Sequence, residues 1–189
     1  MKHHFFIFEF ALSALAYTSS SRAGLLSSDD VQLRSAATCG NVSDAVPLYT
    51  AYTSKYLDHF YSTSISQITA VVGSQGYAFE GVAARVFATQ ELSTVPFYHL
   101  FQNVVIDSFY TISTTERDLA LQSGYISGST DAYIYPTQIC GSIPFFRLYN
   151  SAATEHFYTT SASVRDSMVA AGWEDGGIAG YVLDSNPCA

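Results

Sequence analysis

The sequence predicts a mainly β fold with short helices, built from three copies of a β-β-α-β unit. The first observation is an internal repeat: similar segments begin around Pro47, Pro96 and Pro144, and each is followed at the same spacing by an acidic residue. The second is composition, because 48% of the residues are hydrophobic and 13% are charged, which favours a packed core over disorder. One unit cannot bury its own apolar face, so we expect a closed, propeller-like ring with pseudo-threefold symmetry.

We place the repeats at residues 46–90, 95–138 and 143–183 of a single domain that spans residues 39–189. A β-trefoil is the alternative architecture. Its units consist of strands and loops, so the helix expected in each copy counts against it.

Each copy can be read as two strands, a helix and a last strand that is continuous or split in two. In the first copy, residues 47–52 form a strand with proline at its entrance, and residues 59–63 form its hairpin partner. The expected last strands are residues 82–87, 130–135 and 178–183.

Helix signals follow the hairpin in every copy. Ser64, Ser113 and Ser161 are placed as N-caps, whose hydroxyls accept a free amide proton. Gln67 and Glu116 stand three residues later and complete a capping box in two copies. The helices are expected to stop at glycines and to pack an apolar face on the sheets. The stop glycines are Gly73, Gly124 and Gly172, and the packing residues of the first helix are Ile68, Val71 and Val72.

Residues 1–16 read as a signal peptide. Lys2 gives a positive start, residues 5–15 are apolar except for Glu9, and Ala14-Leu15-Ala16 fits the small-x-small pattern before cleavage. A buried N-terminal helix is the alternative. Residues 17–38, rich in Ser and Ala, are expected to form a flexible leader.

The three cysteines leave one unpaired after any disulfide. Cys39 opens the repeat region and Cys188 nearly ends it, so a ring would favour a Cys39–Cys188 bridge. Cys39–Cys140 competes with it, because Cys39-Gly40 and Cys140-Gly141 occupy similar places before their repeats. Asn41 begins an Asn-Val-Ser triplet, which is a glycosylation acceptor in a secreted protein.

The charge balance argues against some partners. The net charge is −8 with 8 Lys and Arg, so nucleic acid and an anionic membrane surface are not expected to bind. The sequence has no nucleophile elbow, no phosphate-binding glycine loop and no zinc-protease helix. We therefore expect no catalytic residues, no cofactor and no metal.

The segment around Glu155-His156-Phe157-Tyr158, continued by Gly177-Ile178-Ala179-Gly180-Tyr181-Val182, resembles a repeat family of secreted fungal and bacterial proteins. The pattern of that family includes P-[LF]-Y-R-L-Y, D-H-F-Y-T-T and E-G-[IV]-A-G-Y-V. The resemblance covers residues 46–183 and implies binding, because the repeat occurs alone or attached to bacterial secreted and cell-wall hydrolases. Stand-alone fungal members are similar to the small, non-catalytic subunit of heterodimeric laccases. With five histidines, this chain cannot supply the copper sites of a laccase.

Departures from that pattern are concentrated in the second copy. Ser108 replaces its histidine, and residues 128–132 replace its E-G-[IV]-A block. Glu155 replaces the aspartate of the third copy. If each copy carries a ligand site, the second is expected to be defective.

Acidic residues stand beside histidines in two copies and suggest a proton shuttle or a ligand contact. On a strand, neighbouring side chains point to opposite faces, so an acid does not easily orient its own neighbour. A structural role is therefore favoured over ligand contact, and ligand contact over catalysis. The acid and histidine candidates for ligand contact are Asp58, His59, Asp107, Glu155 and His156. Two histidines together with the acids could bind zinc, but Ser108 stands at the position where the second copy would have to supply a histidine.

Aromatic residues complete the candidate set. Tyr61, Tyr110 and Tyr158 fit the core by alternation, or line a groove in which sugars stack. Trp173 fits either a stacking platform or the core.

Two functions of different class remain, and the resemblance to laccase small subunits favours the first over the second. The first is an accessory subunit that binds a secreted protein partner, such as a laccase large subunit. The second is a lectin-like protein that binds carbohydrate or cell wall and has two or three equivalent shallow sites.

Overall fold

The computed structural model describes residues 38–128, 130 and 132–186. The predicted signal peptide, nearly all of the predicted leader and Cys188 lie outside the described residues. In the described part of the chain the fold is mainly β with three short α-helices, as predicted.

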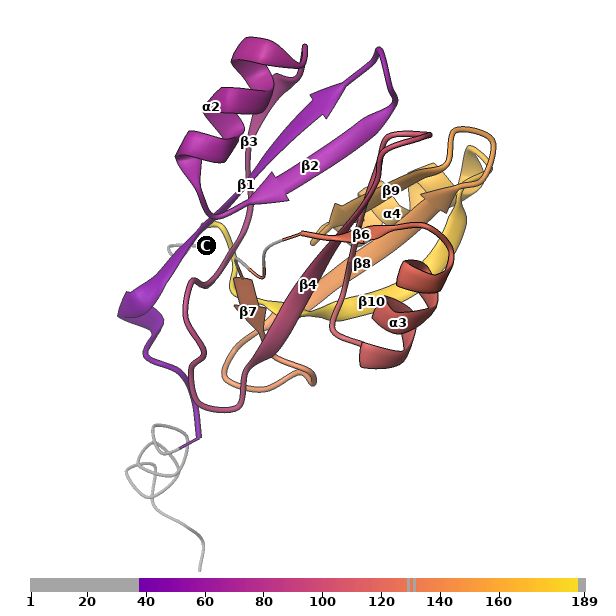
Figure 1. Cartoon of the computed structure of the whole chain (residues 1–189). Coiled ribbons are helices and arrows are strands. Elements are labelled where there is room, and N and C mark those ends of the chain that lie inside the picture. The colour runs from indigo at the N-terminus through magenta and orange to yellow at the C-terminus, as the bar shows by residue number, and fades with distance from the viewer. Residues whose placement is uncertain (1–37, 129, 131, 187–189) are drawn as a thin grey trace, which may run out of the picture.

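The order strand, strand, helix, strand occurs three times along the chain (Figure 1). The elements of the first copy are β1 (Ala45–Thr53), β2 (Asp58–Ser62), α2 (Ile65–Ser74) and β3 (Ala78–Phe87), after a 3-10 turn η1 (Val42–Asp44). Those of the second are β4 (Val95–Gln102), β5 (Asp107–Thr111), α3 (Thr114–Gln122), β6 (Ile126–Ser127) and β7 (Ala132–Ile134). Those of the third are β8 (Ile143–Asn150), β9 (Glu155–Thr159), α4 (Ala162–Ala170) and β10 (Glu174–Val182).

The strands form two sheets that do not close on each other. One sheet has the order β2-β1-β3-β7-β4-β5 with β6 paired to β4, and the other has the order β10-β8-β9. Within each copy the first strand pairs antiparallel with the second, as in Tyr52↔His59 and Tyr149↔His156. The strand pairing therefore does not establish the expected closed propeller.

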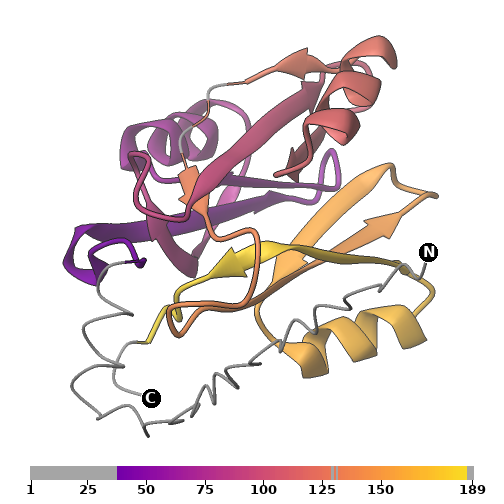
Figure 2. The same cartoon turned by 90° about the horizontal axis from the view of Figure 1, so that it is seen from below.

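The last strands of the three copies nevertheless meet. Phe87 pairs with Tyr133, and isolated bridges join Arg85 to Leu183 and Tyr135 to Tyr181. The helices lie on the outside, each beside the strands of its own copy (Figure 2). The principal core lies between the copies and contains aromatic and aliphatic side chains from all three of them.

Each helix begins at the predicted serine. The side chains of Ser64, Ser113 and Ser161 accept from the backbone N–H three residues later. The predicted capping box has a second bond, from the backbone N–H of the capping serine to the side chain three residues later, and this part of the prediction is wrong. Gln67 and Glu116 accept from the hydroxyls of Ser62 and Thr111 at the end of the preceding strand.

The end of the first helix also differs from expectation. Gly73 lies inside α2, and Gly76 takes the left-handed conformation after the helix, as Gly124 and Gly172 do. Ile68 is buried and packs inward, whereas Val72 is exposed.

Candidate functional site

The acidic residues at the start of β2, β5 and β9 join each copy to another one. Glu155 Oε1 lies 2.6 Å from His59 Nδ1, and Asp107 Oδ2 lies 2.8 Å from His156 Nδ1. Asp58 accepts from the backbone N–H of Ser108 at 2.6 Å. The prediction that an acid does not orient its own neighbour agrees with this geometry, because each acid orients the corresponding residue of a different copy.

All three carboxylates are buried, with exposed fractions of 3% or less. Tyr77 donates to Asp58 at 2.6 Å, and Tyr125 donates to Asp107 at 2.5 Å. Burial raises the pKa of Asp58 to about 6, and the hydrogen bonds from Tyr77 and Ser108 oppose this rise only in part. These carboxylates are committed to contacts inside the protein.

The three candidate tyrosines form a cycle of hydrogen bonds in the core. Tyr61 donates to the Tyr158 carbonyl at 3.1 Å, Tyr158 to the Tyr110 carbonyl at 2.8 Å, and Tyr110 to the Tyr61 carbonyl at 2.8 Å. Each hydroxyl also accepts the backbone N–H of the residue to whose carbonyl it donates. With exposed fractions of 2–3%, these tyrosines lie in the core, which is the first of the two positions expected for them.

A crevice lies at the contact between the second and third copies and has a volume of about 330 Å³. We call it the Arg147 crevice; its lining is Phe109, Glu116, Leu119, Arg147, Tyr149, His156, Glu174, Asp175 and Gly176. Arg147 donates to both carboxylate oxygens of Glu116, at 2.9 and 3.0 Å. These bonds hold the pKa of Glu116 below its usual value, although burial acts in the opposite direction.

A second crevice lies at the contact between the first and second copies and has a volume of about 290 Å³. We call it the His99 crevice; its lining is Phe60, Val71, Gln75, Tyr77, His99, Phe101, Ser108, Ile126, Ser127 and Gly128. By repeat position, His99, Phe101 and Ser108 correspond to Arg147, Tyr149 and His156. The two crevices are therefore equivalent places at successive contacts between copies.

The aromatic floor is also equivalent. The Phe60 ring lies 5.6 Å from the His99 ring, and the Arg147 guanidinium lies 5.4 Å from the centre of the Phe109 ring. In each crevice a glycine leaves space for the side chain that contacts this ring, His99 in one crevice and Arg147 in the other. A Cβ on Gly128 would stand 2.4 Å from His99, and a Cβ on Gly176 would stand 2.8 Å from Arg147.

The contact between the third and first copies has different residues at these positions. Thr50 stands where the others have His99 and Arg147, and Glu80 stands where they have glycine. The Glu80 carboxylate lies 3.6 Å from His59 Nε2, so its side chain occupies this contact. Trp173 is half-buried here and makes an edge-to-face contact with Phe157, at 6.3 Å between ring centres.

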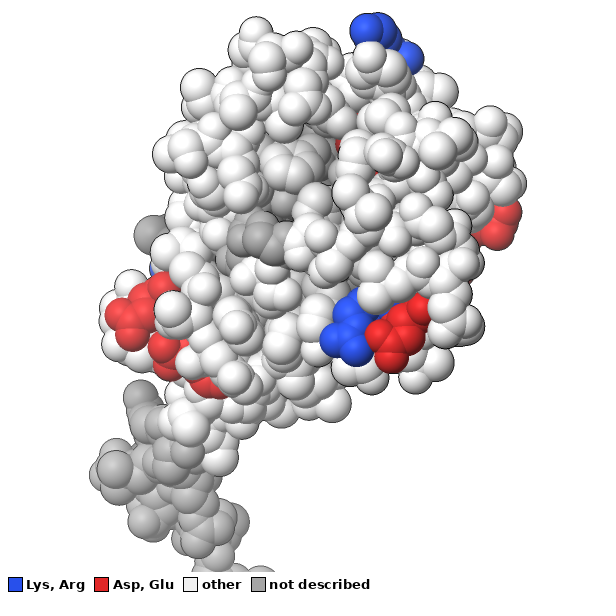
Figure 3. Space-filling model, viewed as in Figure 1, with Lys and Arg blue, Asp and Glu red and all other residues white. Residues whose placement is uncertain are grey.

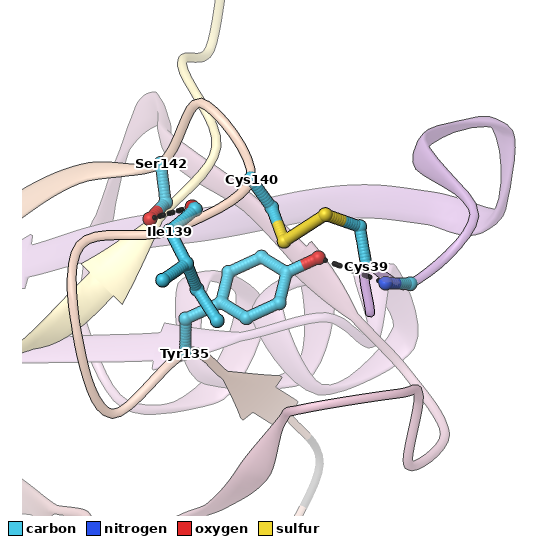
Figure 4. The surroundings of a disulfide bond; sticks show 6 residues. Cys39, Tyr135, Ile139, Cys140 and Ser142 are labelled. Atoms are coloured by element: carbon cyan, nitrogen blue, oxygen red, sulfur yellow. Dashed lines mark hydrogen bonds between the residues drawn. A yellow bond between two sulfur atoms is a disulfide. The ribbon is translucent and has the colours of Figure 1, made fainter. Parts of the chain in front are cut away.

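The disulfide joins Cys39 to Cys140, with the two Cα atoms 5.6 Å apart (Figure 4). The favoured Cys39–Cys188 bridge was wrong, and the competing one is present. Tyr135 fixes this region, because its hydroxyl accepts the N–H of Gly40 at 3.1 Å. The start of the first copy is thus tied to the start of the third. Asn41 is exposed beside the bridge, and its side chain accepts from the hydroxyl of Ser43 at 2.6 Å.

Sequence reasoning missed the crevice residues Glu116, Arg147 and Tyr149. The arginine was visible in the P-[LF]-Y-R-L-Y segment of the third copy, but the sequence does not show that it reaches the helix of another copy. No group of three or more His, Cys, Asp or Glu suited to a metal ion occurs within residues 38–128, 130 and 132–186.

The helices in the described part of the chain are too short or too polar to cross a lipid bilayer. No curated protein and no solved structure matches the chain. Residues 47–183 match a family described as Domain of unknown function (DUF5648), and this match begins at the first repeated proline and ends after the last strand. Since the match covers most of the sequence, the chain belongs to the DUF5648 family.

Proposed function

We propose that this protein is a secreted, non-catalytic, lectin-like carbohydrate-binding protein, and that the Arg147 crevice is its sugar site. The observation that supports this most is the convergence of an aromatic ring with both hydrogen-bond donors and acceptors in one crevice. Ligand sites are typically concave and combine apolar walls with a few oriented polar groups.

The crevice offers a sugar each kind of contact that it needs. Tyr149 is half-buried and its ring packs against that of His156, tilted by 34° with 4.7 Å between ring centres, so its position is fixed. Arg147 and Glu116 bond to each other, but a guanidinium has five N–H donors and a carboxylate has about four acceptor positions, so each keeps capacity for a sugar hydroxyl. Glu174 is exposed and supplies further acceptors. Since Asp107 holds His156 Nδ1, the other ring nitrogen remains for a ligand. A volume of about 330 Å³ is at the lower end of the range for small-ligand pockets and suits one or two sugar rings.

The burial of the three acids beside the repeated aromatic pairs supports a non-catalytic role for them. A general acid or base must come within hydrogen-bond reach of its substrate. Asp58, Asp107 and Glu155 are buried and hold neighbouring copies together. They therefore act as structural residues in this proposal.

Secretion is part of the proposal. A structural disulfide suits an oxidising compartment, and it joins residues that are far apart in the sequence. Asn41 is exposed and accessible to glycosylation. The predicted signal peptide gives the route of export.

A glycan array with the mature protein tests the sugar site, with Tyr149→Ala and Phe101→Ala as a matched pair. Tyr149 and Phe101 occupy the same repeat position in the two crevices. We expect binding to fall about five- to tenfold in Tyr149→Ala, because a ring contact is worth about 0.5–1.5 kcal/mol beyond the area that it buries, and to persist in Phe101→Ala. A blank array with folded wild-type protein, or equal loss in both variants, would contradict the proposal. Circular dichroism checks the folding of each variant.

The accessory-subunit hypothesis has its own supporting observation. The turns of the β1–β2 and β4–β5 hairpins lie at the same end of the molecule (Figure 1) and expose apolar side chains. The exposed residues are Tyr56, Leu57, Val104 and Val105. A hollow of about 360 Å³ between these hairpins includes Tyr56 and Ile106 in its lining. The side of the molecule seen in Figure 3 carries few charged side chains, and Lys55 of the β1–β2 turn is the charged residue in the lining of this hollow.

A pull-down from culture filtrate tests this second candidate. A secreted oxidase such as a laccase large subunit is expected in stoichiometric amount, and Val104→Glu should abolish its recovery. Ile65→Glu, an equal change at an exposed site on α2, serves as the control. Recovery that is insensitive to Val104→Glu would remove the hairpin turns as the docking surface.

A further inference from the structure

We propose that the His99 crevice is a second binding site, distinct from the sugar site, and that it takes a small uncharged aromatic compound. The expectation that the second copy is defective would leave this crevice without a ligand. Its lining points instead to a change of ligand class.

The first step is the loss of charge at equivalent positions. The Arg147 crevice is lined by Arg147, Glu116, Glu174 and Asp175, together with His156. At the positions of Arg147, Glu174 and Asp175, the His99 crevice has His99, Ile126 and Ser127. None of its described lining residues is Lys, Arg, Asp or Glu. A charged ligand would lose water there without gaining an oppositely charged partner at the surface of the crevice.

The second step is the gain of aromatic and aliphatic walls. Phe60, Tyr77 and Phe101 contribute rings from two copies, and Val71 and Ile126 contribute aliphatic edges. Phe60 already makes edge-to-face contacts with Tyr77 at 6.5 Å and with His99 at 5.6 Å. A ligand ring would extend this set of aromatic contacts, each worth about 0.5–1.5 kcal/mol beyond the area that it buries.

The third step is that the walls are held in place without a ligand. The His99 ring stacks on Tyr110 at 4.5 Å with 9° between their planes. Tyr77 is fixed by its hydrogen bond to Asp58, and both Asp58 oxygens accept hydrogen bonds from Tyr77 or Ser108. The carboxylate below the crevice is therefore satisfied, and the crevice needs little rearrangement to bind.

The size agrees with this class of ligand. A volume of about 290 Å³ lies near the lower limit for small-ligand pockets, and one substituted ring fits within it. Ile126 is 54% exposed at the rim, so its side chain is available to a ligand and its replacement should not disturb the core.

Three probes with the same ring test the proposal: benzyl alcohol, benzoate and benzylamine. Titrations followed by amide chemical shifts should show benzyl alcohol binding with a Kd on the order of 1 mM, as expected for a ligand of this size. The perturbed amides should lie around Phe101, Ile126 and Ser127. Benzylamine and benzoate should bind at least about tenfold more weakly, since each brings an uncompensated charge.

Ile126→Glu supplies the decisive variant, because it places in this crevice the residue type that Glu174 provides in the other. We expect it to abolish binding of benzyl alcohol, whereas Val169→Glu, a similar change at an exposed position of α4, should leave binding intact. Glycan binding should be unchanged in both variants, so failure here is separate from failure of the sugar site. Absence of benzyl alcohol binding, equal binding of the three probes, or binding that survives Ile126→Glu would overturn the proposal.

Discussion

Two sets of contacts join the same three copies, and they differ in how strictly the sequence repeats them. In the core, Tyr61, Tyr110 and Tyr158 are the same residue type with the same two hydrogen bonds each. The second set, which we call the acid set, consists of the buried acids Asp58, Asp107 and Glu155 with their partners in other copies. Here the acceptor is Asp or Glu, and the partner is His or Ser. The first set satisfies a buried backbone N–H and a buried C=O at once, which requires one group that both donates and accepts. A carboxylate only accepts, so any of several donors can satisfy it.

In the acid set, the loss of a tyrosine in the third copy is accompanied by a longer acidic side chain. Tyr77 and Tyr125 donate to the aspartates of the first two copies. The third copy has Trp173 at that position and the longer Glu155 as its acid. Glu155 reaches His59 without a tyrosine hydroxyl, so variation is tolerated where the donor can change.

Replacing one tyrosine of the core set should have the largest effect. Tyr110→Phe leaves the N–H and the C=O of Tyr61 without partners in a buried site. We expect the free energy of unfolding to fall by about 2–5 kcal/mol, because each unsatisfied buried group costs about 1–3 kcal/mol. Urea denaturation measures this loss. Tyr133→Phe, whose hydroxyl bonds to none of the described residues, should change stability by less than about 0.5 kcal/mol.

Asp58 should make stability depend on pH. Its pKa in the folded protein is about 6 and its usual value is 3.8, so the folded state binds the proton more tightly. The free energy of unfolding should therefore rise as the pH falls from 7 to 4, by up to about 3 kcal/mol from this group alone. Asp58→Asn should remove this contribution and be at least as stable as wild type at pH 7. If the free energy of unfolding changed by the same amount in wild type and in Asp58→Asn between pH 7 and pH 4, Asp58 would not be the cause.

The two acids around His59 should differ in importance. Glu80 is 41% exposed and 3.6 Å from His59 Nε2, whereas Glu155 is buried and 2.6 Å from Nδ1. Glu80→Ala should cost less than about 1 kcal/mol, as for other exposed ion pairs. Glu155→Gln should cost more, because it weakens a charge-assisted hydrogen bond between copies. Thermal unfolding of the two variants compares them, and equal losses would contradict this ranking.

The sequence was sufficient to predict elements that depend on local chemistry. The serine caps and the hairpins follow from residue types at fixed spacing. The sequence leaves open a split last strand in every copy, and among the described residues the second copy has one. The tyrosines were also placed in the core as one reading. These features are set within one copy, where alternation and capping act over a few residues.

Contacts between copies could not be predicted in the same way. The pairing of Glu155 with His59, and of Arg147 with Glu116, joins residues from different copies. Their distances depend on how the copies are oriented, which spacing within a repeat does not determine. The preference for a Cys39–Cys188 bridge over Cys39–Cys140 was wrong for the same reason.

The tyrosine cycle has a consequence for how the chain folds. Tyr61 and Tyr158 bond each other across a sequence separation of 97, so the first copy needs the third before its core groups are satisfied. In a linear repeat array, each unit contacts only its neighbours and shortened arrays can still fold. Here, no copy is a terminal cap that can be removed. The domain should unfold in a single cooperative transition and fold slowly for its size, because distant segments must meet early.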